Sequence, residues 1–529
     1  MKTLIFGLTL LSLPLLFAAT RPRERPALAI VLIIDGLRPD SITSEIMPNL
    51  DRLRKTGVWY TRSHSVFPTV TRVNAASIST GMLPSEHGVV SNSLYLPAVS
   101  EKLLNDGDYQ SLLSLAKLNG GRVVGPKSLG EYFGEAGIRY VAVSSGSTGN
   151  ALLLNPTAHN GNGPGGNTVV INSGFEDGAR VAFPDALNTT LLSRYGTEKG
   201  NSGNPSLVWT ERVLREYVLD NLHPQVIVDW MDQPDGAQHE FGVGSPEALA
   251  ALRLVDQQIG LLQDRLRQMG LEAKTDIIVT SDHGFDYEPA ADLLAPLREA
   301  NLAADDVVVD AEGGSSLLYV KGHAPDKIER LVARLQASEM TNAIFVASAR
   351  PANGTFRCAP GSERGFVPGT FALELAHECL PSHGPDIIVT WRWDAAKNPF
   401  GVAGTQWVPG RPGATSQTAH SGHGALNPYT THTVLLAAGR DFQKGKTIEV
   451  PAGNQDIAAT LLAIEGLSVP ASIQGRVLSE GLKNRPAGRV VVPSIRRIEA
   501  SAGSYCAELE VSYAGDHAYL DSARRCAGK

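Results

Sequence analysis

The feature that most constrains the fold is an uninterrupted apolar segment, residues 27–34, which ends at Asp35. A strand with one face in water alternates apolar and polar residues, whereas a strand covered by helices on both faces is apolar throughout. The segment therefore predicts a central strand of a parallel sheet, with Asp35 at its carboxyl end.

The same pattern recurs further along the chain. Apolar segments at 140–143, 224–230 and 275–280 alternate with segments of helical periodicity, of which 246–269 is the longest. Strands that alternate with helices form a mostly parallel sheet lying between helices, which is the α/β class. Ligands bind beyond the carboxyl ends of the strands in such sheets. We therefore expect the functional residues among the polar residues that follow the strands.

These polar residues are aspartates and histidines, which commonly bind metal ions, together with one threonine. The set comprises Asp35, Thr71, Asp235, His239, Asp282, His283 and His423. Asp235 and His239 are four residues apart, so on one helical turn both side chains point the same way. The carboxylates and imidazoles are numerous enough to give each of two ions three ligands. Mixed Asp and His ligands favour zinc over calcium or magnesium, which prefer oxygen alone.

A hydroxyl-rich segment, residues 67–81, supplies the threonine of this set. Because the residue before a proline is disfavoured in the α conformation, Pro68 prevents a helix from beginning earlier. We expect a helix of small residues after it, with Thr71 or Thr69 as the N-cap. A hydroxyl at a helix N-terminus lies beside N–H groups that suit an anion. This pattern alone does not decide between the two threonines.

The chain of 529 residues is long enough for more than one folded unit. The strand–helix alternation defines a catalytic α/β core at 27–290, and it stops after that. We expect an inserted α+β cap at 291–410, a second part of the core at 411–485, and a small β-like C-terminal appendage at 486–529. The net charge of -7 gives no basis for a nucleic-acid-binding surface.

The N-terminus predicts export. Lys2, an apolar run and the small residues Ala18 and Ala19 are typical of a signal peptide over residues 1–19. The alternative is a retained N-terminal anchor, and only then would the protein contact a membrane. Four cysteines fit an oxidising, periplasmic or extracellular compartment. Of the three possible connectivities we expect near neighbours to pair, Cys358 with Cys379 and Cys506 with Cys526.

Five motifs, taken in order, resemble those of the alkaline phosphatase superfamily. They are Asp35-Gly36-Leu37-Arg38-Pro39-Asp40, Pro68-Thr69-Val70-Thr71 with Thr80-Gly81 and Pro84-x-x-His87-Gly88, Pro234-Asp235-x-x-x-His239-x-x-Gly242, Ser281-Asp282-His283-Gly284, and Gly422-His423-Gly424. The closest likeness is to the nucleotide pyrophosphatase/phosphodiesterase branch, and it covers roughly residues 28–290 and 415–470.

The resemblance implies roles for single residues. Asp35, Asp282 and His283 would hold one zinc ion, which also binds Thr71. Asp235, His239 and His423 would hold the second. Thr71 would be the nucleophile, and a phospho-threonine intermediate would then be hydrolysed. Asn92 matches the family's side-chain amide that binds a phosphate oxygen.

Two departures from the family pattern bear on the substrate. Nucleotide-cleaving members usually follow the threonine with Phe-Pro-Asn-His, whereas this chain has Arg-Val-Asn-Ala at 72–75, so the aromatic residue that stacks on a nucleobase is missing there. Related monoesterases commonly carry Lys-x-Arg after the strand matching 140–143, where this chain has no cation over 144–150. Arg72 is the one candidate substitute, and helical geometry favours a place for it at the pocket rim.

These observations favour an exported two-zinc phosphodiesterase or pyrophosphatase acting on a small-molecule phosphoester. Alternatives are an alkaline phosphomonoesterase or phosphonate hydrolase that uses the same site, and a non-catalytic binding protein that keeps the fold. The sequence does not indicate an oligomeric state.

Overall fold

The computed structural model describes residues 27–105, 107–160, 168–174, 182–196, 203–289, 306–352, 355–359, 361–407, 420–484 and 491–526. The expected signal peptide lies outside these residues, as do parts of the expected cap.

A nine-stranded sheet forms the centre of the molecule, in the order β22-β2-β21-β10-β1-β9-β6-β7-β8. Its parallel strands are β1 (Leu28–Ile34), β6 (Tyr140–Ser144), β7 (Thr168–Asn172), β9 (Val226–Met231) and β10 (Thr275–Thr280). The edges contain antiparallel pairs and are made by β2 (Val58–Tyr60), β8 (Ala182–Phe183), β21 (Leu435–Gly439) and β22 (Lys446–Ile448). The expected α/β fold with a mostly parallel sheet is confirmed.

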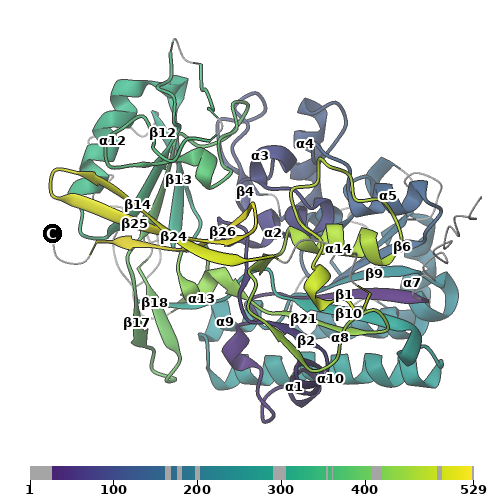
Figure 1. Ribbon diagram of the computed structural model, residues 1–529. Helices are drawn as coiled ribbons and strands as arrows, with labels where there is room; N and C mark the ends of the chain where they lie inside the picture. Colours follow the sequence, from purple (N-terminus) through teal and green to yellow (C-terminus); the bar gives the residue numbers. More distant parts are fainter. Residues whose placement is uncertain are drawn as a thin grey trace, which may run out of the picture.

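Helices cover both faces of this sheet. Alternate residues of β1 face opposite ways, and all are buried because a helical layer lies on each side. Ala29, Val31 and Ile33 pack with one layer, made by α2 (Thr71–Thr80), α4 (Tyr109–Leu118), α5 (Leu129–Glu135), α6 (Thr148–Leu154) and α14 (Asp456–Ile464). Residues 28, 30, 32 and 34 pack with the other, made by α1 (Pro48–Thr56), α7 (Ala186–Tyr195), α8 (Asn204–Val213), a π-helix (Leu214–Leu222) and α10 (Pro246–Gln268). Figure 1 shows the two layers above and below the sheet.

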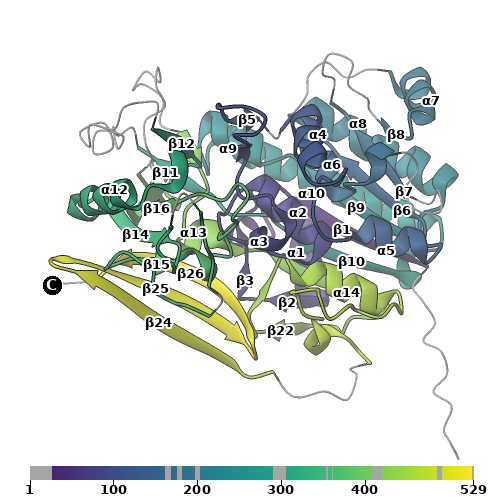
Figure 2. The same cartoon turned by 90° about the horizontal axis from the view of Figure 1, so that it is seen from above.

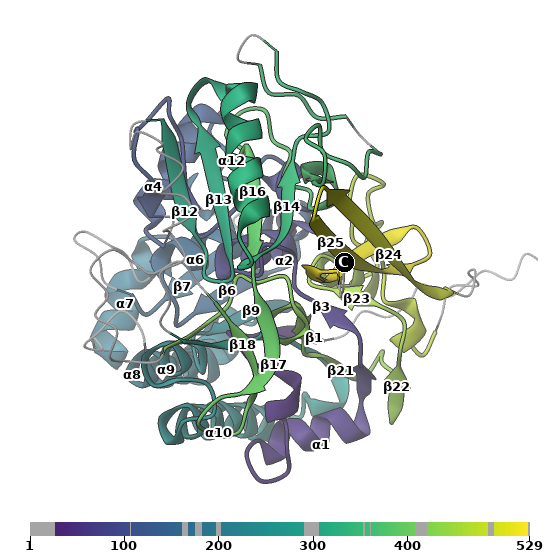
Figure 3. The same cartoon turned by 90° about the vertical axis from the view of Figure 1, so that its left-hand side faces the viewer.

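The region after β11 (Asp286–Glu288) builds two smaller sheets beside the core (Figure 3). One has five strands and carries α12 (Pro325–Ala337); its strands are β12 (Val307–Ala311), β13 (Ser315–Val320), β16 (Ile387–Trp391), β14 (Thr341–Val346) and β15 (Phe371–Ala372). The other joins β17 (Trp393–Lys397), β18 (Ala403–Gln406), β11 and β19 (His420–Gly422). β12 and β13 pair antiparallel as a hairpin.

The C-terminal segment is a long antiparallel ribbon of β24 (Pro493–Ala502), β25 (Tyr505–Ala514) and β26 (His517–Arg525). It runs along the side of the molecule, past both the five-stranded sheet and the core (Figure 2). Ribbon residues such as Leu509 and Val511 share one hydrophobic cluster with β14 and β16. On the core side β26 contacts β3 (Ser63–His64) and α13 (Pro428–Thr431). The ribbon therefore packs against both larger parts.

Short elements complete the described chain. They are α3 (Pro84–His87), α9 (Asp235–Phe241), and the strands β4 (Ser93–Leu94), β5 (Leu104–Asn105), β20 (His432–Thr433) and β23 (Ala452–Gly453). Both expected disulfides, Cys358–Cys379 and Cys506–Cys526, are formed. Among the residues described, no helix combines the length and apolar character needed to cross a membrane.

Candidate two-metal site

Three neighbouring strands bring the predicted ligands to one edge of the sheet. Asp35 follows β1, while Asp282 and His283 follow β10 on one side of it. On the other side, β9 leads into α9, which carries Asp235 and His239 on one turn as predicted. Because β9, β1 and β10 are parallel, their carboxyl ends meet at this edge.

His423 reaches the same place by strand pairing. It follows β19, which pairs antiparallel with β11, the strand that begins three residues after His283. The turn after it needs Gly424, whose φ is +81° and where an added Cβ would lie 1.6 Å from the carbonyl oxygen of Glu312. All the predicted ligands, distant in sequence, thus converge.

The first ligand group consists of Asp35, Asp282 and His283, all buried. His283 Nε2 lies 3.1 Å from Asp282 Oδ2 and 3.5 Å from Asp35 Oδ1. The hydroxyl oxygen of Thr71 lies 3.4 Å from the same nitrogen. These are the residues that the sequence assigns to one ion together with the nucleophile.

The second group surrounds Asp235. Its Oδ1 lies 3.4 Å from His239 Nε2 and 3.8 Å from His423 Nε2. His283 also lies within reach of this group, and its ring stacks on that of His423 with centroids 3.7 Å apart. The two groups therefore adjoin through His283 and form one continuous site.

The hydrogen bonds of the three histidines fix which nitrogen faces the site. The Nδ1 atoms of His239, His283 and His423 lie 2.9–3.0 Å from the carbonyl oxygens of Ser421, Gly284 and Thr69. A carbonyl only accepts, so each Nδ1 carries the proton, and in a neutral ring Nε2 then presents a lone pair. This arrangement, in which a backbone carbonyl orients the ring, is typical of histidines that bind metals.

The carboxylates present matching unpaired oxygens. Asp35 Oδ1, Asp235 Oδ1 and Asp282 Oδ2 are buried without a hydrogen-bond partner among the described residues. Burial, with the negative charges of Asp282 and Asp235, raises the pKa of Asp35 well above its usual range, and burial also raises the pKa of Asp282. Buried carboxylates facing imidazole lone pairs need positive charge between them. The donor set therefore fits two metal ions of the zinc type.

Thr71 lies at the first position of α2, not at its N-cap as expected; Val70 is the N-cap and makes no side-chain cap. The N-capping acceptor comes from elsewhere in the chain, because Asn92 Oδ1 accepts from the backbone N–H of Arg72 at 2.9 Å. Thr69 is not available either, since its hydroxyl donates to the Ala425 carbonyl at 2.8 Å. Of the two threonines, only Thr71 directs its hydroxyl at the ligand cluster.

The other two predicted site residues lie at the start of α2. With its oxygen bonded to the backbone of Arg72, Asn92 keeps its NH₂ group as a donor for another acceptor. Arg72 extends towards the loop after β5, where its Nη2 lies 2.9 Å from the position of a Cβ built on Gly107. Its guanidinium thus approaches a loop instead of the histidine rings.

Sequence reasoning missed the residues that orient the ligands. Trp230, at the end of β9, donates its indole N–H to Asp35 Oδ2 at 2.9 Å. Asn454 donates to Asn74 Oδ1 at 2.9 Å and to the carbonyls of Ser281 and Asp282 at 3.1 Å. None stands in a recognisable pattern; only the position of Trp230 beside the strand end could have suggested it.

Known proteins share this architecture. The fold resembles that of murine ectonucleotide pyrophosphatase/phosphodiesterase 5, with a TM-score of 0.57, 16% identity, and coverage of 87% of this chain and 100% of that one. In sequence, human ectonucleotide pyrophosphatase/phosphodiesterase family member 1 is 27% identical over 264 residues, 48% of this chain and 23% of the human protein. Human bis(5'-adenosyl)-triphosphatase ENPP4 is 25% identical over 273 residues, 51% of this chain and 49% of that protein.

The fold and the site define the class as that of the nucleotide pyrophosphatase/phosphodiesterases. The sequence model of the type I phosphodiesterase / nucleotide pyrophosphatase family matches residues 29–357, which is more than half of the chain. The chain belongs to this family, as the motifs predicted. The alignments span between about a quarter and a half of the length of the curated relatives.

Proposed function

We propose that this protein is an exported two-zinc phosphodiesterase or pyrophosphatase, with Thr71 as its nucleophile. The observation that carries the proposal is the position of the Thr71 hydroxyl, 3.4 Å from His283 Nε2, beside two adjoining groups of Asp and His ligands. A hydroxyl placed beside two cation sites is the arrangement that in-line displacement at phosphorus requires.

Asp35, Asp282 and His283 would hold one ion, and Asp235, His239 and His423 the other. Such ions stabilise an alkoxide and the charge that develops on the phosphoryl oxygens. Thr71 Oγ1 would form a bond to phosphorus as the bond to the leaving oxygen breaks. Water would then cleave the Thr71–phosphorus ester and regenerate the hydroxyl. The Asn92 NH₂ group, held by the backbone of Arg72, would donate to a non-bridging phosphate oxygen.

The ester type follows from the charges around the site. A monoester dianion has one more negative charge at phosphorus than a diester, so a site specialised for it needs further cations there. No lysine or arginine occurs at 144–150, and Arg72 extends towards the loop that contains Gly107. These facts support a preference for diesters, with Arg72 nearer the leaving group.

The relatives extend the proposal to substrate and location. An inactive variant of the murine structural relative was solved in complex with AMP, which makes nucleotide diesters the first natural substrates to test, although the stacking aromatic is missing here. The human relative is named an ectonucleotide pyrophosphatase/phosphodiesterase, and both cysteine pairs of this chain form disulfides, which persist in oxidising compartments. Both facts support export.

The direct test compares kcat/KM for an aryl phosphodiester, an aryl phosphomonoester and an aryl phosphonate. We expect the diester to be cleaved fastest and Thr71→Ala to abolish all three rates. A faster monoester or phosphonate rate would assign the site to one of those hydrolases. The absence of all turnover in zinc-loaded protein would indicate a binding protein with this fold.

A further inference from the structure

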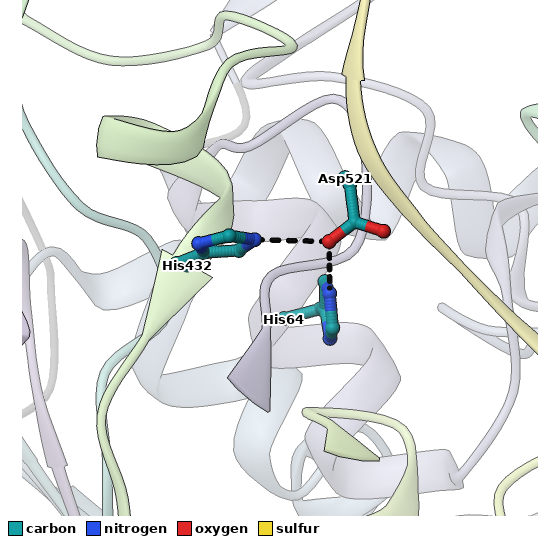
Figure 4. A group of neighbouring side chains, drawn as sticks. All are labelled: His64, His432 and Asp521. Atoms are coloured by element: carbon teal, nitrogen blue, oxygen red, sulfur yellow. Dashed lines mark hydrogen bonds and ion pairs between the residues drawn. The ribbon is translucent and has the colours of Figure 1, made fainter. Parts of the chain in front are cut away.

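Two histidines and an aspartate form a second cluster, separate from the two ligand groups described above (Figure 4). His64 ends β3 and His432 begins β20, and the antiparallel register of these strands places the two residues opposite each other. Asp521, in β26 of the C-terminal ribbon, lies against both. Its Oδ1 is 2.9 Å from His64 Nε2 and 3.0 Å from His432 Nε2.

A neutral His64 ring has too few N–H donors for the two acceptors that its nitrogens contact. Its Nδ1 lies 2.9 Å from the carbonyl oxygen of Ala452, and its Nε2 faces the Asp521 carboxylate. Both partners are acceptors, whereas a neutral imidazole has one N–H. With Nδ1–H donated to the carbonyl, Nε2 presents a lone pair to an anionic oxygen, in a side chain only 1% exposed.

The catalytic site contains the same arrangement three times. There too, each histidine donates Nδ1–H to a backbone carbonyl and turns Nε2 towards a carboxylate oxygen, as His239 does between Ser421 and Asp235. His64 therefore shares its arrangement, with Nδ1 on a backbone carbonyl and Nε2 facing a carboxylate, with the histidines of the candidate metal centre.

The cluster is also built as metal sites usually are. The second carboxylate oxygen of Asp521 accepts from the hydroxyl of Ser512, which in turn accepts from Arg62 Nη2 at 2.5 Å. The His64 ring stacks on Tyr519 with centroids 5.3 Å apart. Hydrogen bonds behind the ligands fix their orientation, while the 37% exposure of the His432 side chain leaves an open side for water.

We propose that His64, His432 and Asp521 bind a third divalent metal ion, with water completing its coordination. Bonds of about 2.0–2.2 Å to two imidazole nitrogens and a carboxylate oxygen accommodate the observed separations of 2.9 and 3.0 Å at angles near 90°. The mixed nitrogen and oxygen ligands favour a transition metal over calcium or magnesium.

The ion would be structural. β3 leads through residues 65–70 to the nucleophile Thr71, and β20 follows α13 and the turn that contains His423. The third ligand, Asp521, belongs to the ribbon. One ion would therefore fasten the C-terminal ribbon to two segments that approach the catalytic centre, without taking part in the reaction.

The test is crystallographic and locates each ion. Full-length protein purified without chelator and crystallised without added metal is measured just above and just below the zinc absorption edge. We expect an anomalous difference peak among His64 Nε2, His432 Nε2 and Asp521 Oδ1, besides the peaks at the catalytic site. A peak that is present above the edge and lost below it would assign zinc, and a peak at another metal's edge would assign that metal.

Elemental analysis gives an independent count. Asp521→Asn should bind one ion fewer per chain than wild type, whereas Asp516→Asn, an exposed aspartate of the same ribbon, should bind the wild-type number. No peak at the cluster in wild-type crystals, with equal metal counts in the two variants, would overturn the proposal. The cluster would then be an ion pair between Asp521 and a doubly protonated His64. The map decides even if Asp521→Asn does not fold.

Discussion

Thr69 and Thr71 are two residues apart, yet their hydroxyls have different partners. Thr69 is fully buried and donates to the Ala425 carbonyl, which commits it to holding the loop before α2. Thr71 is directed at His283. Because the Asn92 side chain accepts from the backbone N–H of Arg72, the start of the helix does not need the Thr71 hydroxyl, which lies against His283.

Replacing Thr71 by alanine should therefore abolish turnover. We expect kcat for an aryl diester to fall by more than roughly 1,000-fold, since a nucleophile is removed, while the catalytic ions stay bound in elemental analysis. Thr69→Ser keeps the hydroxyl and is the matched control, which should retain most activity. An active Thr71→Ala enzyme would place the nucleophile elsewhere.

Arg72 should affect binding of the leaving group and not the chemical step. A hydrogen bond to a charged group is worth about 1.5–3 kcal/mol, so Arg72→Ala should raise KM for diesters with an anionic leaving group by ~10- to 100-fold. Small neutral aryl diesters, measured in parallel, should show nearly unchanged kinetics. A loss confined to phosphomonoesters would instead place Arg72 at the phosphoryl group.

At the scale of elements, three asparagines hydrogen-bond around α2, the helix that begins at Thr71. Asn74 binds the loop before α2 through the backbone of Val66 and Val70, and Asn92 caps the helix. Asn454, between β23 and α14, joins Asn74 to the carbonyls at the end of β10. These amides connect the start of α2, where Thr71 lies, to the strand end that carries Asp282 and His283.

Removing the side-chain amide of Asn454 should displace Thr71 relative to the candidate metal ligands. Because a small misplacement of a reacting group costs up to about 100-fold in rate, we expect Asn454→Ala to lower kcat by ~10- to 100-fold with KM little changed. Its thermal unfolding midpoint should also fall, since Asn74 loses a buried donor. Wild-type kcat together with a lower midpoint would restrict Asn454 to a structural role.

The central strands could be predicted because burial on both faces leaves a continuous apolar segment, as in β1. The convergence of the candidate ligands could be predicted because these residues follow such strands in recognisable motifs. The edge strands β2 and β22 have three residues each and depend on long-range pairing, so no local pattern identifies them. The helix start at Thr71 was misjudged because its cap, Asn92, is distant in sequence. His64, His432 and Asp521 were missed because each is unremarkable alone.

At the scale of the whole molecule, the β-like C-terminal appendage expected from the sequence is an antiparallel ribbon that packs against both larger parts. Its apolar residues complete the cluster of the five-stranded sheet, and β26 contacts the core. We propose that residues 27–290 and 411–485 form the catalytic core, 291–410 the cap and 486–529 the C-terminal ribbon. The sequence pattern alone could not show how the ribbon packs. The alternation within a strand does not reveal whether its outer face lies against a neighbouring element or in water.

Metal removal should destabilise the whole chain. The carboxylates of Asp35, Asp235 and Asp282 converge in a buried site, where bound cations offset their mutual repulsion. Ions that bind only the folded state add several kcal/mol at high occupancy, so chelation should lower the thermal unfolding midpoint by ~10 °C. Zinc should restore it and magnesium should not. A midpoint that chelation leaves unchanged would contradict the two-metal site.

The most direct test of the account is to trap the covalent intermediate. Excess bis(4-nitrophenyl) phosphate is mixed with the zinc-loaded enzyme, the reaction is quenched in acid within the first turnover, and peptides are mapped by mass spectrometry. The account predicts a 4-nitrophenyl phosphate ester on Thr71, absent from Thr71→Ala. Two results would contradict it. One is release of one equivalent of nitrophenol with the ester on Thr69 or another residue, and the other is release of nitrophenol with no ester on any peptide.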